Sequence, residues 1–546
     1  HFVMTGSSER VLIALSFAGL AAAVMIKIPF SSALLAVCLL IEGILILYAV
    51  RAWNRTEVQA IPLPAAPWHG TCLILLTLSF TAIVSLWGIS RVIGFATPTY
   101  DFGIFAQMFH SMKSNGLPMT TLERDGLLSH FHVHVSPIYY LMLPFYMLIP
   151  HPATLQVMQA AVLASAVVPL WLLGKHHGLS GCQRLLLCSA LLFYPALAGG
   201  AAYDLHENCF LAPLLLWLFL SIDRRCLPLT LLTAVLTLAV KEDAAVYVAI
   251  IALWMMIRAL LHADHREVIG GTLLFALSLG YFLLTTNYLA TVGDGVMSNR
   301  YKNLMAENND SLFSVAVFVL SHPMKALFEC LDLEKLFYIG LTLAPLLGLP
   351  LLTRRYERYL LLIPYVLVNL MPDYVYQHNI FFQYSFGSLA CLFYLTAVNL
   401  ADLRARLRFP ALFSVMTVCA ILFSTHILPR TQDYLSRYLE NREECAQIRE
   451  VLDTIPTDAS VTAGTFMTTY LSSREVLYDL GYATREHLLS SAYVVIDLNH
   501  EGELTHYATG NRKNGYARLL SLLYSNGYEV YVSLKNRLIV FRKSQK

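Results

Sequence analysis

Charged residues are scarce in this sequence. Asp, Glu, Lys and Arg make up 14% of the 546 residues, whereas soluble domains contain about 25%. Hydrophobic residues reach 57% and the mean hydropathy is +0.58. These values exclude an ordinary set of soluble domains and an intrinsically disordered chain. The net charge of +2 leaves no surplus of positive charge for a nucleic-acid partner.

Cysteine is also sparse, with 10 residues in the chain and no Cys-x-x-Cys pair. Most of these cysteines lie in apolar stretches, and only Cys330 and Cys445 fall clearly in segments expected outside the membrane. The sequence therefore supports neither a disulfide scaffold nor a metal-thiolate site.

The few charges are unevenly distributed. Residues 430–546 hold 28 of the 74 charged residues, about one position in four, which is typical of a soluble domain. We therefore expect a membrane domain at 4–429 and a small C-terminal domain at 430–546, with the natural chain beginning at Met4.

Long apolar runs fill the membrane domain. A helix needs about 20 mainly apolar residues to cross the hydrocarbon core, and on this rule the sequence predicts a polytopic α-helical membrane protein with about thirteen spans. They lie near 11–27, 32–50, 71–90, 152–174, 183–199, 209–222, 227–240, 243–261, 267–290, 333–353, 358–372, 380–400 and 409–427.

Basic residues fall in alternate loops of this arrangement. They are Arg51 and Arg55, Lys175 and Arg184, Arg224 and Arg225, Arg258 and Arg266, Arg354, Arg355 and Arg358, and Arg404, Arg406 and Arg408. Because short cytoplasmic loops are enriched in Lys and Arg, we expect a multi-pass protein of the cytoplasmic membrane, with a cytoplasmic N-terminus and an extracytoplasmic C-terminal domain.

Two long segments, 91–151 and 291–332, are then expected on the outer side. The first ends in the apolar run IYYLMLPFYMLIP, which is too short to span and is expected to form interfacial helices.

The C-terminal segment has the pattern of a small α/β domain. A helical period at 441–454 precedes strand-like runs at ASVTAG, REVLYDL and AYVVIDL, and a helix at 516–525 precedes YEVYVSL and RLIVFRK, joined at Lys535-Asn536. It contains no phosphate loop and no catalytic triad, so we expect a binding or docking module.

Ionisable residues gather at the outer ends of the apolar runs. They are Asp101, the alternating His130, His132 and His134, then Asp204, His206 and Glu207, then Lys241, Glu242 and Asp243, and finally His378. Ionisable groups at membrane depth cost about 2.5–3.5 kcal/mol each and usually line a wet cavity. The sequence therefore predicts one polar cavity that opens outward.

Each cluster also has a simpler interpretation. Asp101 could simply cap the helix that begins at Phe102. Lys241 could pair with its own neighbours Glu242 or Asp243. Asp204, His206 and Glu207 are solvated loop residues on the simpler view, and His378 is a satisfied helix-end histidine.

Metal binding is a further possibility at these positions. In an extended chain His130, His132 and His134 would project from one side, and histidine with carboxylate suits a divalent ion. The candidate ligands are His134, Asp204, His206 and Glu207.

Four ordered motifs carry a family resemblance over roughly 95–400. The runs YDFGIFAQMF, HVSPIYYLMLPFY, FYPAL with YDLHE, and LAVKEDAAVY resemble a family of prokaryotic multi-span membrane proteins that is similar to the C-type glycosyltransferase (GT-C) superfamily. The chain departs from the family pattern in three ways: two spans precede the usual first one, His-Val-Ser-Pro replaces His-Phe-Ser-Pro, and Asp-Leu-His-Glu lacks the proline of Phe-His-Pro.

The resemblance implies an integral membrane glycosyltransferase with a GT-C-like membrane domain. Its donor would be a polyprenyl-phosphate-linked sugar, its acceptor an extracytoplasmic glycan, lipid or protein, and its reaction inverting. Asp101 occupies the place of the catalytic base. The departing phosphate needs positive charge, for which Lys241 or a metal ion is the candidate, with Glu242, Asp243 and His378 in the same cavity.

Two other classes compete with this function. A transporter or lipid flippase would show charges near mid-membrane and an internal repeat, and no convincing repeat is found. A scaffold whose tail recognises a partner would leave Lys241, Glu242 and Asp243 without a task.

Overall fold

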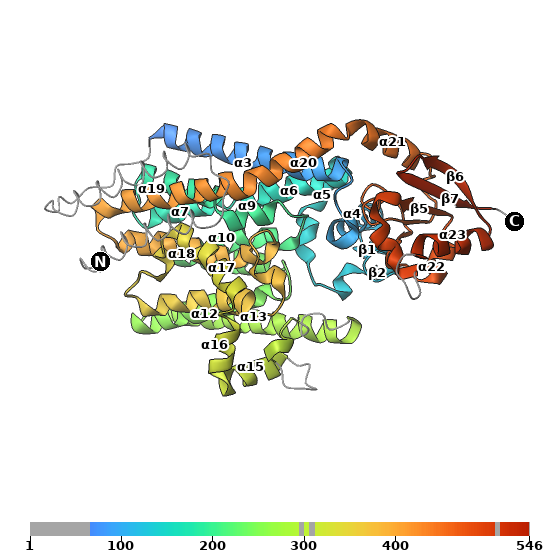
Figure 1. Cartoon of the computed structure of the whole chain (residues 1–546). Coiled ribbons are helices and arrows are strands. Elements are labelled where there is room, and N and C mark those ends of the chain that lie inside the picture. The colour runs from blue at the N-terminus through green and yellow to red at the C-terminus, as the bar shows by residue number, and fades with distance from the viewer. Residues whose placement is uncertain (1–65, 294–299, 305–311, 508–513, 545–546) are drawn as a thin grey trace.

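The computed structural model describes residues 66–293, 300–304, 312–507 and 514–544. Apolar helices lie roughly side by side in one bundle, and the strand-containing tail forms a body at the end of that bundle near α4 (Figure 1). The predicted spans 11–27 and 32–50 lie outside the described residues.

Several helices are long and apolar enough to cross a membrane. In the described part of the chain there are six, or seven if one bent pair is a single span. They are α3 (Pro67–Ile93), α6 (Pro152–Ala164) with α7 (Val167–His176), α12 (Ala244–Leu261), α13 (His265–Val292), η11 (Gln383–Ser385) with α18 (Phe386–Asp402), and α19 (Ala405–Leu422) with η12 (Phe423–Ile427) and α20 (Leu428–Glu440). The expectation of a mostly helical membrane protein is confirmed.

The bent pair consists of α8 (Gly181–Leu192) and α9 (Pro195–Ala201), with 45° between the two axes. Tyr194 is extended, with ψ of 126°, because the ring of a following proline disfavours helical backbone at the preceding residue. The bend therefore follows directly from Pro195.

Four predicted spans are shorter or interrupted helices. Two of them correspond to α10 (Leu211–Asp223) and α11 (Leu227–Leu238), of 13 and 12 residues. In 333–353, α17 (Leu333–Leu343) gives way to the turns η6 (Ala344–Leu346) and η7 (Leu349–Leu351), and 358–372 holds η8 (Tyr356–Leu362) and η9 (Tyr365–Leu370). Hydropathy counts apolar residues, but it does not register the prolines and glycines that end helices.

The centre of the bundle is α18, which packs against α10 and α7. Phe219 and Tyr394 stack there with 4.0 Å between ring centroids. By contrast α13 leaves Ile269, Leu273 and Leu284 more than half exposed. Such apolar surface suits contact with lipid, where no hydrophobic penalty applies.

The segment between α3 and α6 contains short elements only. They are η1 (Thr99–Gly103), α4 (Ile104–Asn115), the antiparallel pair β1 (Met119–Thr120) and β2 (Leu128–Ser129), η2 (His130–His132), η3 (Pro137–Leu141) and α5 (Leu143–Leu148). Phe145, Leu148 and Ile149 are 60–80% exposed, an apolar surface of the kind that interfacial helices present. The second long segment holds η5 (Lys302–Leu304), α15 (Leu312–Ser321) and α16 (Pro323–Glu329).

The tail contains a five-stranded mixed sheet in the order β4-β3-β5-β7-β6. The parallel strands are β3 (Val461–Ala463), β4 (Leu477–Asp479) and β5 (Tyr493–Asp497), and β6 (Tyr528–Leu534) and β7 (Leu538–Lys543) are antiparallel. The helical elements of the tail are α21 (Arg442–Leu452), α22 (Arg485–Ser490), η13 (Leu498–Tyr507) and α23 (Gly515–Ser525). Two short turns of the membrane domain are η4 (Glu207–Phe210) and η10 (Val375–His378). Asn536 has a φ of 57° in the β6–β7 turn, a conformation that asparagine tolerates.

Candidate active site

Asp101 lies in η1, which follows α3 and leads directly into α4. Its side chain is partly exposed, and within the described residues its carboxylate has no hydrogen bond and no ion pair. Burial, together with the negative charges of Asp204 and Glu207, raises its pKa to about 6. The group is therefore mostly ionised near neutral pH and free to accept a proton.

Asp204 is held by a basic partner instead. The Arg91 guanidinium, in the last turn of α3, donates to both carboxylate oxygens at 2.5 and 3.0 Å, and Gln156 Nε2 donates at 3.0 Å. Asp204 and Arg91 are both buried. This bidentate pair joins α3 to the segment after α9.

Glu207 is the centre of a second buried cluster. Its Oε1 lies 3.0 Å from Lys241 Nζ, its Oε2 lies 3.0 Å from His206 Nδ1, and the Tyr139 hydroxyl donates to Oε2 at 2.6 Å. Burial alone would raise the pKa of Glu207, but His206 and Lys241 bring it well below its usual value. Lys241 is 1% exposed, so its charge is compensated inside the protein.

The His-rich stretch does not form an extended strand. His130 to His132 form the 3-10 turn η2, so the three rings do not share one side, and that prediction is wrong. His130 Nδ1 lies 2.9 Å from Glu123 and His134 Nδ1 lies 2.8 Å from Glu242, whose second oxygen accepts from the Val135 amide. Glu242 therefore links the segment after β2 to the turn before α12.

The predicted metal ligands are dispersed among these pairs. His134 faces Glu242, Asp204 faces Arg91, and His206 and Glu207 share their site with Lys241. Over 66–293, 300–304, 312–507 and 514–544, no three His, Cys, Asp or Glu side chains are grouped in a way that could hold a metal ion. The four residues do not fit a divalent ion, because cations of the protein already occupy their carboxylates.

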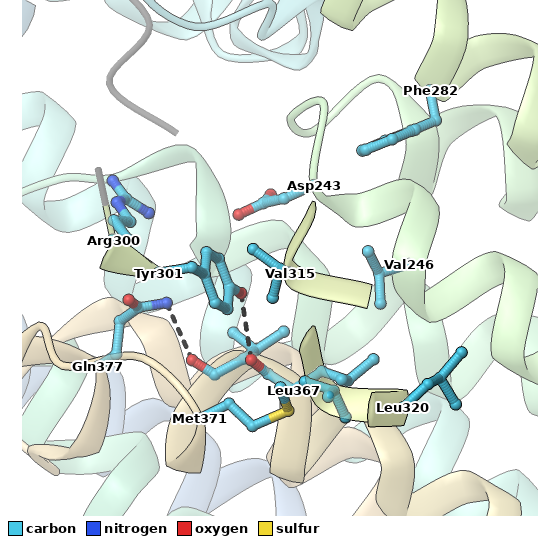
Figure 2. Close-up of a pocket in the computed structure, with 12 residues that line it drawn as sticks. Asp243, Val246, Phe282, Arg300, Tyr301, Val315, Leu320, Leu367, Met371 and Gln377 are labelled. Atoms are coloured by element: carbon cyan, nitrogen blue, oxygen red, sulfur yellow. Dashed lines mark hydrogen bonds between the residues drawn. The ribbon is translucent and has the colours of Figure 1, made fainter. Parts of the chain in front are cut away.

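Asp243 opens onto a cavity of about 430 Å³. Figure 2 shows its carboxylate directed toward the side on which Arg300 lies. Arg300 and Gln377 are the other charged or amide groups in the wall. Most of the wall is apolar and comes from α12, α13, α15 and η9 with the residue after it: Val246, Phe282, Val315, Val319, Leu320, Leu367, Val368 and Met371. Tyr301 and Gln377 donate to the carbonyls of Leu367 and Val368 at 3.1 and 2.9 Å, and both carbonyls belong to the π-helical turn η9.

Arg300 is a cation that sequence reasoning did not identify. Its guanidinium lies over the rings of Tyr374 and Tyr384, at 5.6 and 5.2 Å from their centroids. No carboxylate within the described ranges forms an ion pair with it. No pattern in the sequence marks Arg300, which lies more than fifty residues after Lys241.

Tyr374 connects Arg300 with Asp101. Burial raises the pKa of the Tyr374 phenol, Arg300 opposes that rise and Asp101 adds to it. Both charges therefore lie near this ring. Within the described residues, a carboxylate and a guanidinium that lack ion pairs therefore both lie within electrostatic range of the Tyr374 ring.

His378 lies in a different place from the other predicted residues. It lines a second cavity of about 770 Å³ with Phe337, Tyr338 and His426, and its Nε2 lies 3.7 Å from Glu334. Its neighbour Gln377 lines the first cavity. Adjacent residues of η10 therefore point to opposite sides, which separates His378 from Lys241 and Asp243.

The chain was compared with known protein families, curated proteins and solved structures. Among curated proteins none matches it. The crystal structure of ArnT from Cupriavidus metallidurans in the apo state is similar at 12% identity, covering 86% of this chain and 98% of that chain with a TM-score of 0.48. The model of the predicted membrane protein family DUF2079 matches residues 91–540. That match includes the Asp101 motif, the Lys241 turn and most of the tail, and this chain belongs to the DUF2079 family of predicted membrane proteins.

Proposed function

We propose that the protein is an integral membrane glycosyltransferase. It moves a sugar from a polyprenyl-phosphate donor to an extracytoplasmic acceptor, a glycan, lipid or protein, with inversion at the anomeric carbon. The observation that carries the proposal is Asp101: a partly exposed carboxylate without a partner among the described residues, with a pKa raised to about 6. Ionisable groups with perturbed pKa values cluster at functional sites.

Asp101 acts as the general base. It takes the proton of the acceptor hydroxyl as that oxygen attacks the anomeric carbon from the side opposite the phosphate. The new carbon–oxygen bond forms while the bond from the sugar to the phosphate oxygen breaks, and polyprenyl phosphate leaves with the electron pair. Base assistance of this type contributes about 10²–10⁴-fold to the rate.

Arg300 is the better candidate than Lys241 for contact with the donor phosphate. Lys241 is paired with Glu207 at 3.0 Å and is almost completely buried, so withdrawing it would leave an isolated carboxylate. Among the described residues Arg300 forms no ion pair, and its guanidinium lies over the rings of Tyr374 and Tyr384. A guanidinium can bind phosphate through two parallel N–H donors and offset the charge that develops on the leaving oxygen.

The cavity below Arg300 suits the first isoprenoid units of such a donor. Its wall is apolar and its polar groups stand at one end (Figure 2). Asp243 has an Oδ1 that is buried without a hydrogen-bond partner in the described structure. In this proposal it accepts a hydrogen bond from a sugar hydroxyl, since an unmatched buried oxygen of this kind gains from such a ligand.

The test uses the purified full chain in liposomes with a panel of polyprenyl-phosphate-linked sugars and a panel of glycan, lipid and protein acceptors. Its readout is release of polyprenyl phosphate. Asp101→Asn should reduce release by about 10²–10⁴-fold. Asp373→Asn is the matched control, because Asp373 is exposed next to Tyr374. Release that is equal in both variants would reject Asp101 as the base. Transport of an intact donor across the bilayer would favour a flippase instead.

A further inference from the structure

The tail holds the segment that carries Asp101. Thr99, two residues before Asp101, is fully buried. Its amide donates to Thr465 Oγ1 at 3.1 Å, and its hydroxyl lies 2.8 Å from Thr468 Oγ1 and hydrogen-bonds Asp479 Oδ2. All three partners belong to the tail, so the backbone just before Asp101 is fixed by residues more than 360 positions later.

Asp479 is well placed to act as the anchor of this contact. It ends β4, is 3% exposed, and its Oδ1 accepts from the Gly481 amide at 2.7 Å. Oδ2 is thereby directed at the Thr99 hydroxyl. Because the Gly481 amide fixes one oxygen of this buried carboxylate, the other oxygen fixes the position of the Thr99 hydroxyl.

The residues after Asp101 are fixed by the same domain. A Cβ at Gly103 would lie 2.7 Å from Thr468 Oγ1, so the loop backbone approaches the tail as closely as a glycine allows. Ile104 and Leu122 share one hydrophobic core with Val461 and Leu477 of the sheet.

Two side chains of the first outer segment extend this contact. Thr121 Oγ1 donates to the Leu477 carbonyl at 2.5 Å and accepts from the Leu477 amide at 3.0 Å, so it pairs with the free edge of β4. Gln107 Nε2 donates to the Glu475 carbonyl at 3.2 Å. The tail and the Asp101 segment therefore form one packed unit.

We propose that the tail is a positioning element of the active site and that Asp479, acting through Thr99, sets the place of Asp101. This inference rests on the proposed function of Asp101 as the base. Within the described residues the Asp101 carboxylate makes no contact of its own that would hold it. Its position therefore comes from the backbone on both sides, which Thr99 and Gly103 fix. A misplacement of about 1 Å at a catalytic group can cost about 10²-fold in rate.

The experiment compares four variants of the purified full chain. Thr99→Val removes the hydroxyl and keeps the shape, Thr99→Ser keeps the hydroxyl, and Asp479→Asn removes the anchoring charge. Asp497→Asn is the matched control, because Asp497 is a buried aspartate of the same sheet that pairs with Arg537 and His500.

Two readouts are taken. The first is the pH profile of sugar transfer. The second, which does not depend on activity, is the pH dependence of carbodiimide modification of Asp101, located by peptide mass spectrometry. The charged groups around Asp101 are Asp204, Glu207, Lys241 and Glu123, and none is altered in these variants.

We expect wild type and Thr99→Ser to share one profile with a midpoint near pH 6. In Thr99→Val and Asp479→Asn the released segment becomes better solvated, so the midpoint should fall by about one pH unit and transfer by about tenfold or more. Asp497→Asn should keep the wild-type midpoint even if it lowers the temperature of unfolding.

Unchanged profiles in both Thr99→Val and Asp479→Asn would overturn the inference, as would an equal shift in Asp497→Asn. The wild-type protein could also transfer no sugar while the midpoint of Asp101 modification still moves in Thr99→Val and not in Thr99→Ser. In that case the proposed function fails and the positioning by the tail stands.

Discussion

Lys241 and Glu207 form a buried ion pair with 3.0 Å between Nζ and Oε1. Each lies in a different connection of the bundle, Glu207 before α10 and Lys241 before α12. The lysine that the sequence suggested for the donor phosphate therefore already has an internal partner. It compensates the charge of the same Glu207 carboxylate that contacts His206 and accepts a hydrogen bond from Tyr139.

Removing the charge of Glu207 should destabilise the fold. In Glu207→Gln the Lys241 ammonium remains buried without its counter-charge, and breaking a buried pair in this way costs about 3–5 kcal/mol. Thermal unfolding of the detergent-solubilised protein measures the effect. The control is Glu529→Gln, which breaks the exposed pair with Arg542 and should change stability by less than about 0.5 kcal/mol. Equal unfolding temperatures in both variants would show that the Lys241 pair adds no stability.

Arg300 should determine the affinity for a lipid phosphate. Charge-assisted hydrogen bonds contribute about 1.5–3 kcal/mol, so Arg300→Gln should weaken binding of polyprenyl phosphate by about 10- to 100-fold. Lys302→Gln removes an exposed cation two residues along and serves as the control. A titration of each variant with polyprenyl phosphate in nanodiscs gives the two dissociation constants. If the two variants bind equally well, Arg300 does not contact the phosphate.

Sugar transfer should be lost in mild acid. A base must be deprotonated to act, and the pKa of Asp101 is raised from 3.8 to about 6 by burial and by Asp204 and Glu207. Transfer should therefore be constant above pH 7 and fall about tenfold for each pH unit below the pKa. Rates measured between pH 4.5 and 8 would test this, with unfolding followed over the same range. A decline that begins only near pH 4 would mean that Asp101 has its ordinary pKa in the working protein.

Local patterns in the sequence predicted part of this architecture. The apolar runs at 71–90, 243–261 and 267–290 correspond to α3, α12 and α13, because a long uninterrupted apolar run has few alternatives to a buried or membrane helix. The run at 333–353 does not continue as one helix. Pro345, Gly348 and Pro350 lie inside it, and α17 ends at Leu343.

The partners of the polar residues were beyond the reach of the sequence. Asp101 and Lys241 could be selected as ionisable groups beside apolar runs, but the pairing of Lys241 with Glu207 depends on which helix ends meet in three dimensions. The same holds for Thr99 and Asp479, which no local period connects. Arg300 could not be predicted, because an arginine in a polar segment resembles any solvated residue, and its contacts with Tyr374 and Tyr384 depend on the fold.

The membrane orientation can be tested with a cysteine that the protein already has. Cys226 is exposed and free, and it follows Arg224 and Arg225 in a connection that the positive-inside rule places in the cytoplasm. Cys445, by contrast, is 5% exposed and would react poorly from either side. Glu443→Cys places an exposed thiol on α21 instead.

In intact cells a membrane-impermeant maleimide should label position 443 and leave Cys226 unmodified until the cells are lysed. Peptide mass spectrometry identifies which cysteine reacts, so each protein molecule carries its own inside reference. The physical reason is the cost of moving the basic connections across the bilayer, about 2.5–3.5 kcal/mol for each Arg at the helix centre. Labelling of Cys226 but not of position 443 in intact cells would invert the orientation. Asp101 and Arg300 would then face the cytoplasm, where an extracytoplasmic acceptor could not reach them.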